Sequence, residues 1–172
     1  IKTSYMKNKL LLLFVLFVSF FSFSLKAQQG LLINEVMASN DTTIVENTGD
    51  YADWIELYNS TSDPVILNGY YISNNISTPL KFQLSGNLQV PANGYLILWA
   101  SNDTTRGHMH LPFKVSASGE SLYLTLPDGS TLADAVTLGR QKTDISYGRR
   151  TDGAAELSFF AKATPGATNN TS

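Results

Sequence analysis

The sequence contains no cysteine and only two histidines among its 172 residues. The absence of cysteine excludes disulfides, thiolate nucleophiles and zinc sites built on sulfur ligands. Charged residues make up only 15% of the chain, and no run of like charges marks a special face. The sequence also lacks a Gly-x-Ser-x-Gly nucleophile elbow, a phosphate-binding glycine loop and an EF-hand calcium loop. The chain therefore shows no recognisable catalytic motif, and its stability must come from its core alone.

The first 27 residues have the order of a secretory signal. Residues 6–9 are basic, residues 10–23 are almost continuously apolar, and Ala27 is a small residue at the expected cut. The apolar run is shorter than the roughly 20 residues that a membrane span needs, so we expect cleavage and no stable membrane insertion afterwards. Residues 1–5 precede Met6 and are excluded from the fold, either as mis-called upstream sequence or as a non-Met start.

The remaining chain is acidic and long enough to bury a core. The removed segment carries four lysines and no acid, so the mature part has 8 basic and 14 acidic residues and a net charge of −6. Such a domain repels phosphate backbones, which argues against nucleic acid as a partner. We expect residues 28–169 to form one domain and residues 170–172 to be a flexible tail.

Short apolar stretches separated by Gly, Pro, Asn and Asp predict an all-β domain of sandwich or barrel type, without a convincing helix. The segment Pro127-Asp128-Gly129 predicts a hairpin turn, because Asp and Gly tolerate a positive φ. The predicted strands are residues 31–38, 54–58, 65–73 with a bend near Asn68-Gly69, 82–84, 95–100, 114–117, 121–126, 133–137, 145–147 and 157–160.

Alternation along residues 54–58 assigns the two faces of that strand. Ile55 and Leu57 share one face, predicted to be buried, while Trp54, Glu56 and Tyr58 share a mixed face. The strand at 95–100 is apolar on both faces, which predicts a central position in its sheet.

Several segments, in the same order along the chain, resemble the lamin tail domains of bacteria, from about residue 31 to 169. The resemblance begins with Leu32-Ile33-Asn34-Glu35-Val36-Met37-Ala38-Ser39-Asn40 and continues through Gly49-Asp50-Tyr51-Ala52-Asp53-Trp54-Ile55-Glu56-Leu57-Tyr58-Asn59, Leu67-Asn68-Gly69-Tyr70-Tyr71-Ile72-Ser73, Pro91-Ala92-Asn93-Gly94-Tyr95, Ser118-Gly119-Glu120, Asp144-Ile145-Ser146-Tyr147-Gly148-Arg149 and Thr164-Pro165-Gly166-Ala167-Thr168-Asn169.

This resemblance implies an immunoglobulin-like β-sandwich over residues 28–169 and a non-catalytic module of secreted or surface proteins. The opening and closing motifs are most similar to the N-terminal module of CotH-kinase-like proteins. A fold by itself does not fix a function, so the residues must be weighed individually.

Glu35, Asp53 and Glu56 are the acids most closely tied to predicted strands. They could accept backbone N–H groups and tie the 39–53 loop down, hold a hard cation with Asp50, or form an acid/base pair. The first role, accepting backbone N–H groups, is favoured. No metal, cofactor-binding or catalytic residue is assigned.

The two histidines and the aromatic residues could likewise have either a binding role or a purely structural role. His108 and His110 could hold a metal on one strand face, but no third ligand is evident and their neighbours are typical of a solvated loop. The aromatics, Trp54, Tyr58, Tyr70, Tyr71, Tyr95, Trp99 and Tyr147, could form a binding surface, although strands enrich such residues for packing.

Two functions remain open. The first is a secreted, surface or periplasmic interaction or adhesion module that binds an extracellular protein or polysaccharide, or positions a covalently linked downstream domain. The second is the N-terminal fragment of a larger secreted enzyme, a CotH-like kinase, whose catalytic residues lie outside this sequence. A small hydrolase is disfavoured because no nucleophile and base are seen together.

Overall fold

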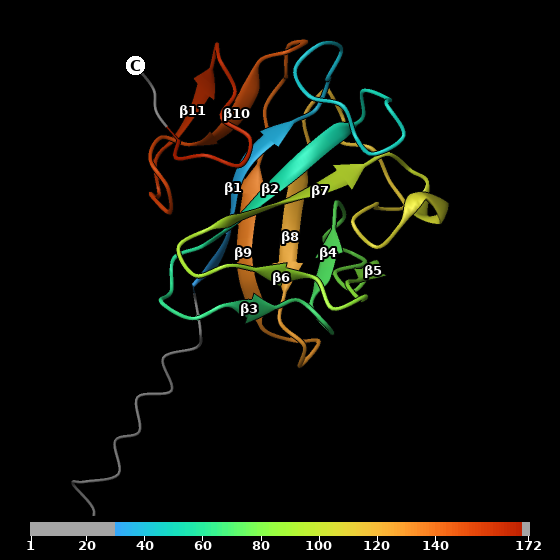
Figure 1. Cartoon of the computed structure of the whole chain (residues 1–172), viewed down its shortest axis with the longest axis vertical. Coiled ribbons are helices and arrows are strands. Elements are labelled where there is room, and N and C mark those ends of the chain that lie inside the picture. The colour runs from blue at the N-terminus through green and yellow to red at the C-terminus, as the bar shows by residue number, and fades with distance from the viewer. Residues whose placement is uncertain (1–29, 170–172) are drawn as a thin grey trace, which may run out of the picture.

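Two antiparallel sheets pack face to face in the computed structural model, which describes residues 30–169 (Figure 1). The predictions of a signal peptide at 1–27, of extraneous residues 1–5 and of a flexible tail at 170–172 fall outside the described residues. Within them, no helix has the length and apolar character needed to cross a membrane.

The larger sheet has five strands in the order β11-β10-β1-β2-β7, and the facing sheet has the order β5-β4-β8-β9. A short β3-β6 ladder completes the sandwich, and one 3-10 turn, η1, follows β7. The bounds are β1 Leu31–Met37, β2 Asp53–Asn59, β3 Val65–Ile66, β4 Tyr71–Ser73, β5 Phe82–Gln83, β6 Gln89–Val90, β7 Tyr95–Ala100, η1 Thr104–Arg106, β8 Ser121–Thr125, β9 Leu132–Thr137, β10 Ser146–Arg149 and β11 Leu157–Phe160. The all-β sandwich is confirmed and is consistent with an immunoglobulin-like arrangement.

The main core lies between the two sheets and contains both residues predicted to point inward from β2. Ile55 and Leu57 are fully buried among side chains from both sheets, as the alternation predicted. The β8–β9 hairpin is also confirmed, with Gly129 at φ +69° and the Asp128 carboxylate accepting the backbone N–H of Ser130 at 2.8 Å.

The opposite face of β2 is buried as well, which the alternation did not predict. Trp54 packs with Met37 and Trp99 in a second apolar cluster, against partly buried side chains that include Ala163. Glu56, on the same face, is also fully buried. Chain segments distant in sequence therefore cover the outer face of the five-stranded sheet.

Three strand predictions are wrong. Residues 114–117 form no strand, because the backbone N–H of Val115 donates to the Asp53 carboxylate at 3.2 Å instead of to a neighbouring strand. Residues 65–73 divide into β3 and β4, separated by a turn in which Gly69 has φ +89°. β7 lies at the edge of its sheet, where residues 109–111 cover it by pairing with Trp99.

A buried ion pair joins the two sheets at an irregularity in β1. The pairing of β1 with β2 shifts between Ile33 and Glu35, and the backbone groups of Ile33 find side-chain partners. Its N–H donates to Asp134 of β9 at 2.8 Å, and its carbonyl accepts from Arg149 of β10 at 3.0 Å. Arg149 also donates to both Asp134 oxygens, at 2.8 and 2.7 Å. The pair thus satisfies the backbone groups that a bulge leaves without a ladder partner.

We expect the β2 core positions to dominate stability. Ile55→Ala or Leu57→Ala removes fully buried methyl groups and leaves a cavity, costing about 2–5 kcal/mol each in a urea unfolding experiment. Ile66→Ala on β3, where the side chain is half exposed, is the matched control and should change stability by about 0.5 kcal/mol or less. An equal loss in the control variant would contradict this placement of the core.

Candidate functional site

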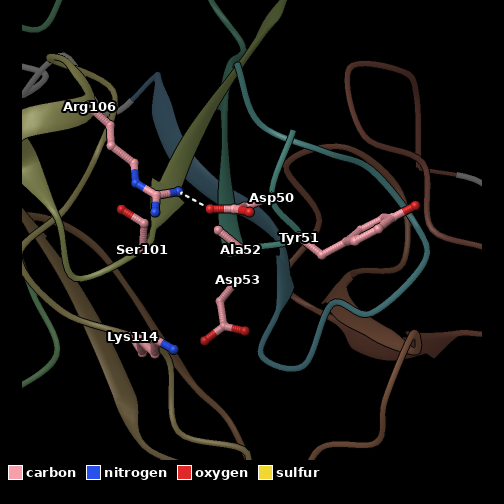
Figure 2. A pocket seen from close by; sticks show the side chains of 7 residues that line it. All are labelled: Asp50, Tyr51, Ala52, Asp53, Ser101, Arg106 and Lys114. Atoms are coloured by element: carbon pink, nitrogen blue, oxygen red, sulfur yellow. Dashed lines mark hydrogen bonds and ion pairs between the residues drawn. The ribbon is translucent and has the colours of Figure 1, made fainter. Parts of the chain in front are cut away.

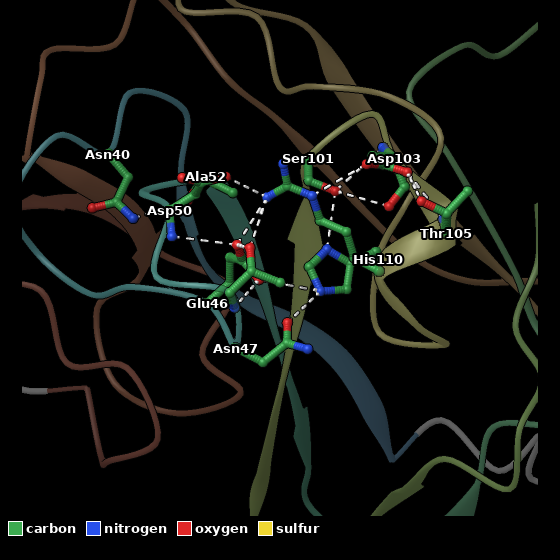
Figure 3. A network of polar contacts seen from close by, with 11 residues as sticks. Asn40, Glu46, Asn47, Asp50, Ala52, Ser101, Asp103, Thr105 and His110 are labelled. Atoms are coloured by element: carbon green, nitrogen blue, oxygen red, sulfur yellow. Dashed lines mark hydrogen bonds and ion pairs between the residues drawn. The ribbon is translucent and has the colours of Figure 1, made fainter.

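Two long connections meet at one end of the sandwich around the side chain of Arg106. Residues 38–52 connect β1 to β2, and residues 101–120 connect β7 to β8. Arg106, on η1, forms ion pairs with Glu46 at 2.8 Å and Asp50 at 2.7 Å from the first connection, and with Asp103 at 3.2 Å from its own (Figure 3). One guanidinium therefore holds the two connections together.

Glu46 is the buried member of this network. Its side chain is fully buried and accepts a hydrogen bond from the Thr48 hydroxyl, a second from the Thr48 N–H at 2.9 Å and a third from the Asp50 N–H at 3.3 Å. Burial raises the pKa of Glu46, but these donors and the Arg106 charge outweigh it and hold the pKa below its usual range. Glu46 is therefore a fixed anion around which the first connection folds.

His110 completes the network and corrects the expectation of a solvated loop. The residue is 1% exposed, with Nδ1 3.0 Å from the Ser101 hydroxyl and Nε2 3.0 Å from Asn47 Oδ1 (Figure 3). Desolvation lowers the pKa of His110, although Glu46, at 3.7 Å, raises it. A neutral ring donates from Nε2 to Asn47, so Nδ1 accepts from Ser101.

Ser101, His110 and Asn47 thus form a chain of hydrogen bonds that sequence reasoning missed. The same alignment of hydroxyl, imidazole and amide occurs where a nucleophile is activated. Here the Ser101 oxygen also accepts the Asp103 N–H at 3.3 Å. That backbone N–H is therefore engaged within the turn and does not point at a bound ligand. The chain of hydrogen bonds fixes the two connections against each other.

His108 behaves as predicted, as an exposed loop residue. It lies on the other side of Arg106, where its Nδ1 is 3.4 Å from the Ser85 hydroxyl. It lines a pocket of about 240 Å³ with largely apolar walls, together with Leu88, Met109, Arg106 and His110. The two histidines therefore border the same pocket, but His110 alone of the two belongs to the hydrogen-bond network around Glu46 and Arg106.

A second pocket, of about 250 Å³, opens beside Arg106 and is polar. Asp50, Tyr51, Ala52, Asp53, Ser101, Arg106 and Lys114 line it (Figure 2). Desolvation raises the pKa of Asp53, although the Val115 N–H and the Lys114 charge lower it. Lys114 is exposed, and Figure 2 shows its amine near the Asp53 carboxylate across the pocket.

The three acids singled out from the sequence do not converge. Asp53 lies in the polar pocket, whereas Glu35 and Glu56 face each other across the β1–β2 ladder and are fully buried. Among residues 30–169, no group of three or more His, Cys, Asp or Glu side chains is arranged to hold a metal ion. The cation interpretation of Glu35, Asp53 and Glu56 as one cluster is therefore not supported by their placement.

Glu35 and Glu56 instead bind the end of the described chain, rather than the 39–53 loop. Glu35 accepts the Ser146 hydroxyl, the Thr164 N–H at 3.1 Å and the Thr164 hydroxyl at 2.8 Å. Glu56 accepts the Gly166 N–H at 2.6 Å and the Asn34 amide at 3.1 Å. Two carboxylates of the first hairpin therefore hold a segment more than one hundred residues away.

Burial gives both of these acids a raised pKa. Desolvation is the largest cause for each, and it raises the pKa of Glu56 to about 7 despite the hydrogen bonds from Asn34 and Gly166. The nearby charges of Glu35 and Asp152 act in the same direction on Glu56. For both groups the hydrogen-bond donors favour the carboxylate anion, whereas burial disfavours it and has the larger effect.

The sequence is similar to one known family over most of the described domain. The model of the lamin tail domain family matches residues 25–140, which include β1 to β9 and all residues of the Arg106 network. β10, β11 and the segment that binds Glu35 and Glu56 lie beyond the matched range. The comparison with curated proteins gives no match.

We expect His110→Ala to destabilise the domain by about 1–3 kcal/mol, because it leaves the Ser101 and Asn47 groups without their shared partner. His108→Ala is the matched control and should change stability by about 0.5 kcal/mol or less. Urea unfolding of the two variants measures the difference. A His110→Ala domain as stable as the control would show that the network does not hold the connections.

The raised pKa of Glu56 predicts a stability that falls as pH rises. The folded state keeps the proton up to about pH 7, whereas the unfolded state loses it near pH 4.5, so folding binds a proton between these values. The contribution to stability is full below about pH 4.5 and is lost by about pH 7, a change of about 3 kcal/mol.

The measurement is the difference between the pH profiles of the wild type and Glu56→Gln. His110 acts in the opposite direction, because its lowered pKa makes the folded state resist protonation below about pH 6.5. Subtracting the two profiles removes this common contribution. The wild type should gain stability relative to the variant on going from pH 8 to pH 5, and parallel profiles would show that Glu56 titrates normally.

Proposed function

The chain belongs to the lamin tail domain family, and on that premise we propose that it is an exported, non-catalytic interaction module that binds an extracellular protein or polysaccharide. Export is supported by the basic, apolar and small-residue order of residues 6–27. The net charge of −6 for residues 28–172 argues against a nucleic-acid partner.

The observation that carries this proposal is the rigid construction of the loop end. Binding residues commonly lie on connections held by a rigid scaffold, as at the ends of immunoglobulin-type sandwiches. Here Glu46, Arg106 and His110 fix the two long connections, and a pocket opens on each side of Arg106. A surface fixed before binding loses little conformational entropy when a ligand arrives.

The alternative is that the module is the front of a larger secreted enzyme, a CotH-like kinase. Docking of residues 164–169 on the sheet is the specific observation in its favour. Asn169 is 2% exposed and donates to the Arg149 carbonyl at 2.5 Å. A domain following this segment would therefore start from a fixed point on the sandwich, and the module would serve to orient it.

We expect residues 28–172, labelled and incubated with extracellular material from the source cells, to bind in a saturable way. Arg106→Ala should weaken binding at least about tenfold, because it removes the ion pairs that hold both connections. Arg150→Ala is the matched control, since it breaks only an exposed ion pair with Glu156 beside the β10–β11 hairpin.

Pretreatment of the material identifies the class of partner. Loss of binding after protease treatment indicates a protein, and loss after periodate oxidation indicates a polysaccharide. Binding that never saturates, or that Arg106→Ala and Arg150→Ala leave equally strong, would contradict an interaction module that acts through its loop end.

A further inference from the structure

The polar pocket holds a cation and an anion that face each other without pairing. Among residues 30–169, no carboxylate lies within ion-pair distance of the Lys114 amine. Asp53 lies across the pocket from it, anchored by the Val115 N–H at 3.2 Å and by a backbone hydrogen bond from Asn40 (Figure 2). A donor and an acceptor therefore point into the same space, and neither is satisfied by the other.

Asp50 and Asp53 contribute two carboxylates to the pocket lining, and Arg106 and Lys114 contribute two cations. Arg106 is already engaged by Glu46, Asp50 and Asp103, so the opposite charges of Asp53 and Lys114 remain for a ligand. A ligand with a net charge of either sign would be attracted by one of them and repelled by the other. A hydroxyl group both donates and accepts, so it can donate to Asp53 while it accepts from Lys114. Hydrogen bonds to charged partners are also stronger than those between neutral groups.

The volume of the pocket limits the ligand to one ring-sized group. At about 250 Å³ it is smaller than the roughly 300–1,000 Å³ of sites that enclose a drug-sized molecule. The Ser101 hydroxyl on its wall is held by His110 and Asp103, so the polar lining is in place before a ligand arrives. The remainder of a larger ligand would lie outside on the loop surface.

We propose that this pocket binds one neutral, hydroxyl-rich sugar residue of an extracellular polysaccharide, with Asp53 and Lys114 as the two groups that bridge its hydroxyls. The inference rests on the proposed function and narrows its ligand to neutral polysaccharides. The apolar pocket around Met109 takes no part in this contact.

The test is affinity electrophoresis of residues 28–172, which include both sheets and the whole hydrophobic core, in gels that contain single soluble polysaccharides. The panel holds neutral polymers (xylan, laminarin and mixed-linkage glucan), acidic alginate and basic chitosan. Asp53→Asn keeps an oxygen for the Val115 N–H, and Lys114→Gln changes an exposed side chain, so both variants should fold. Asp63→Asn and Lys142→Gln are the matched controls, at exposed positions outside the pocket.

We expect at least one neutral polysaccharide to retard the wild type and both controls. Asp53→Asn and Lys114→Gln should each weaken that binding about tenfold, through the loss of a charged hydrogen-bond partner. Retardation by no neutral polymer, retardation by charged polymers alone, or equal retardation of all variants would overturn the inference.

The outcome also separates this inference from the proposed function. If the module still binds extracellular material in a saturable, Arg106-dependent way while the pocket variants behave as wild type, only the sugar site is wrong. If that binding is itself absent, the proposed function fails.

Discussion

A carboxylate that is removed from water must be given hydrogen-bond donors, and much of this domain is arranged to meet that requirement. Glu35 and Glu56 hold the segment at 164–166, and Glu46 shapes the connection between β1 and β2. Asp134 meets the free N–H of the β1 irregularity and pairs with Arg149 across the two sheets. For Glu35, Glu46 and Glu56, donors come from connections or from the segment at 164–166, which lie outside the strands.

The same requirement explains why the loop end around Arg106 differs from the covered outer face of β1 and β2. Around Glu46 the donors and Arg106 favour the anion, so that end of the sandwich carries a permanent charge network with polar walls. Around Glu35 and Glu56 no cation is within ion-pair distance among the described residues, and burial dominates. The loop end is therefore a charge network beside a polar pocket, and the covered sheet face is a closed junction sensitive to protonation.

The sequence was sufficient for those features that depend on local pattern. Period-two alternation placed Ile55 and Leu57 in the core, and turn chemistry placed the hairpin at Asp128 and Gly129. It failed where a distant segment decides the outcome. The outer face of β2 is buried by residues that follow β11, and no feature near Trp54 or Glu56 signals this. His110 lies in a loop, as its neighbours indicated, but Asn47, 63 residues away, covers its ring. The pairing of Arg106 with Glu46 likewise has no local signature.

The segment at 164–169 affects where the boundaries of this domain should be placed, both in its gene and in a recombinant protein. The stretch that the family model matches stops at residue 140, whereas all the donors of Glu35 given above and the Gly166 donor of Glu56 come from residues 146–166. A fragment cut at residue 140 would keep most strands, but it would uncover the outer face of β1 and β2 with Glu35 and Glu56 and leave Asp134 without Arg149. The matched sequence and the packed domain thus have different lengths. A gene fusion joined at residue 140 would place its new partner inside the packed domain, before β10 and β11.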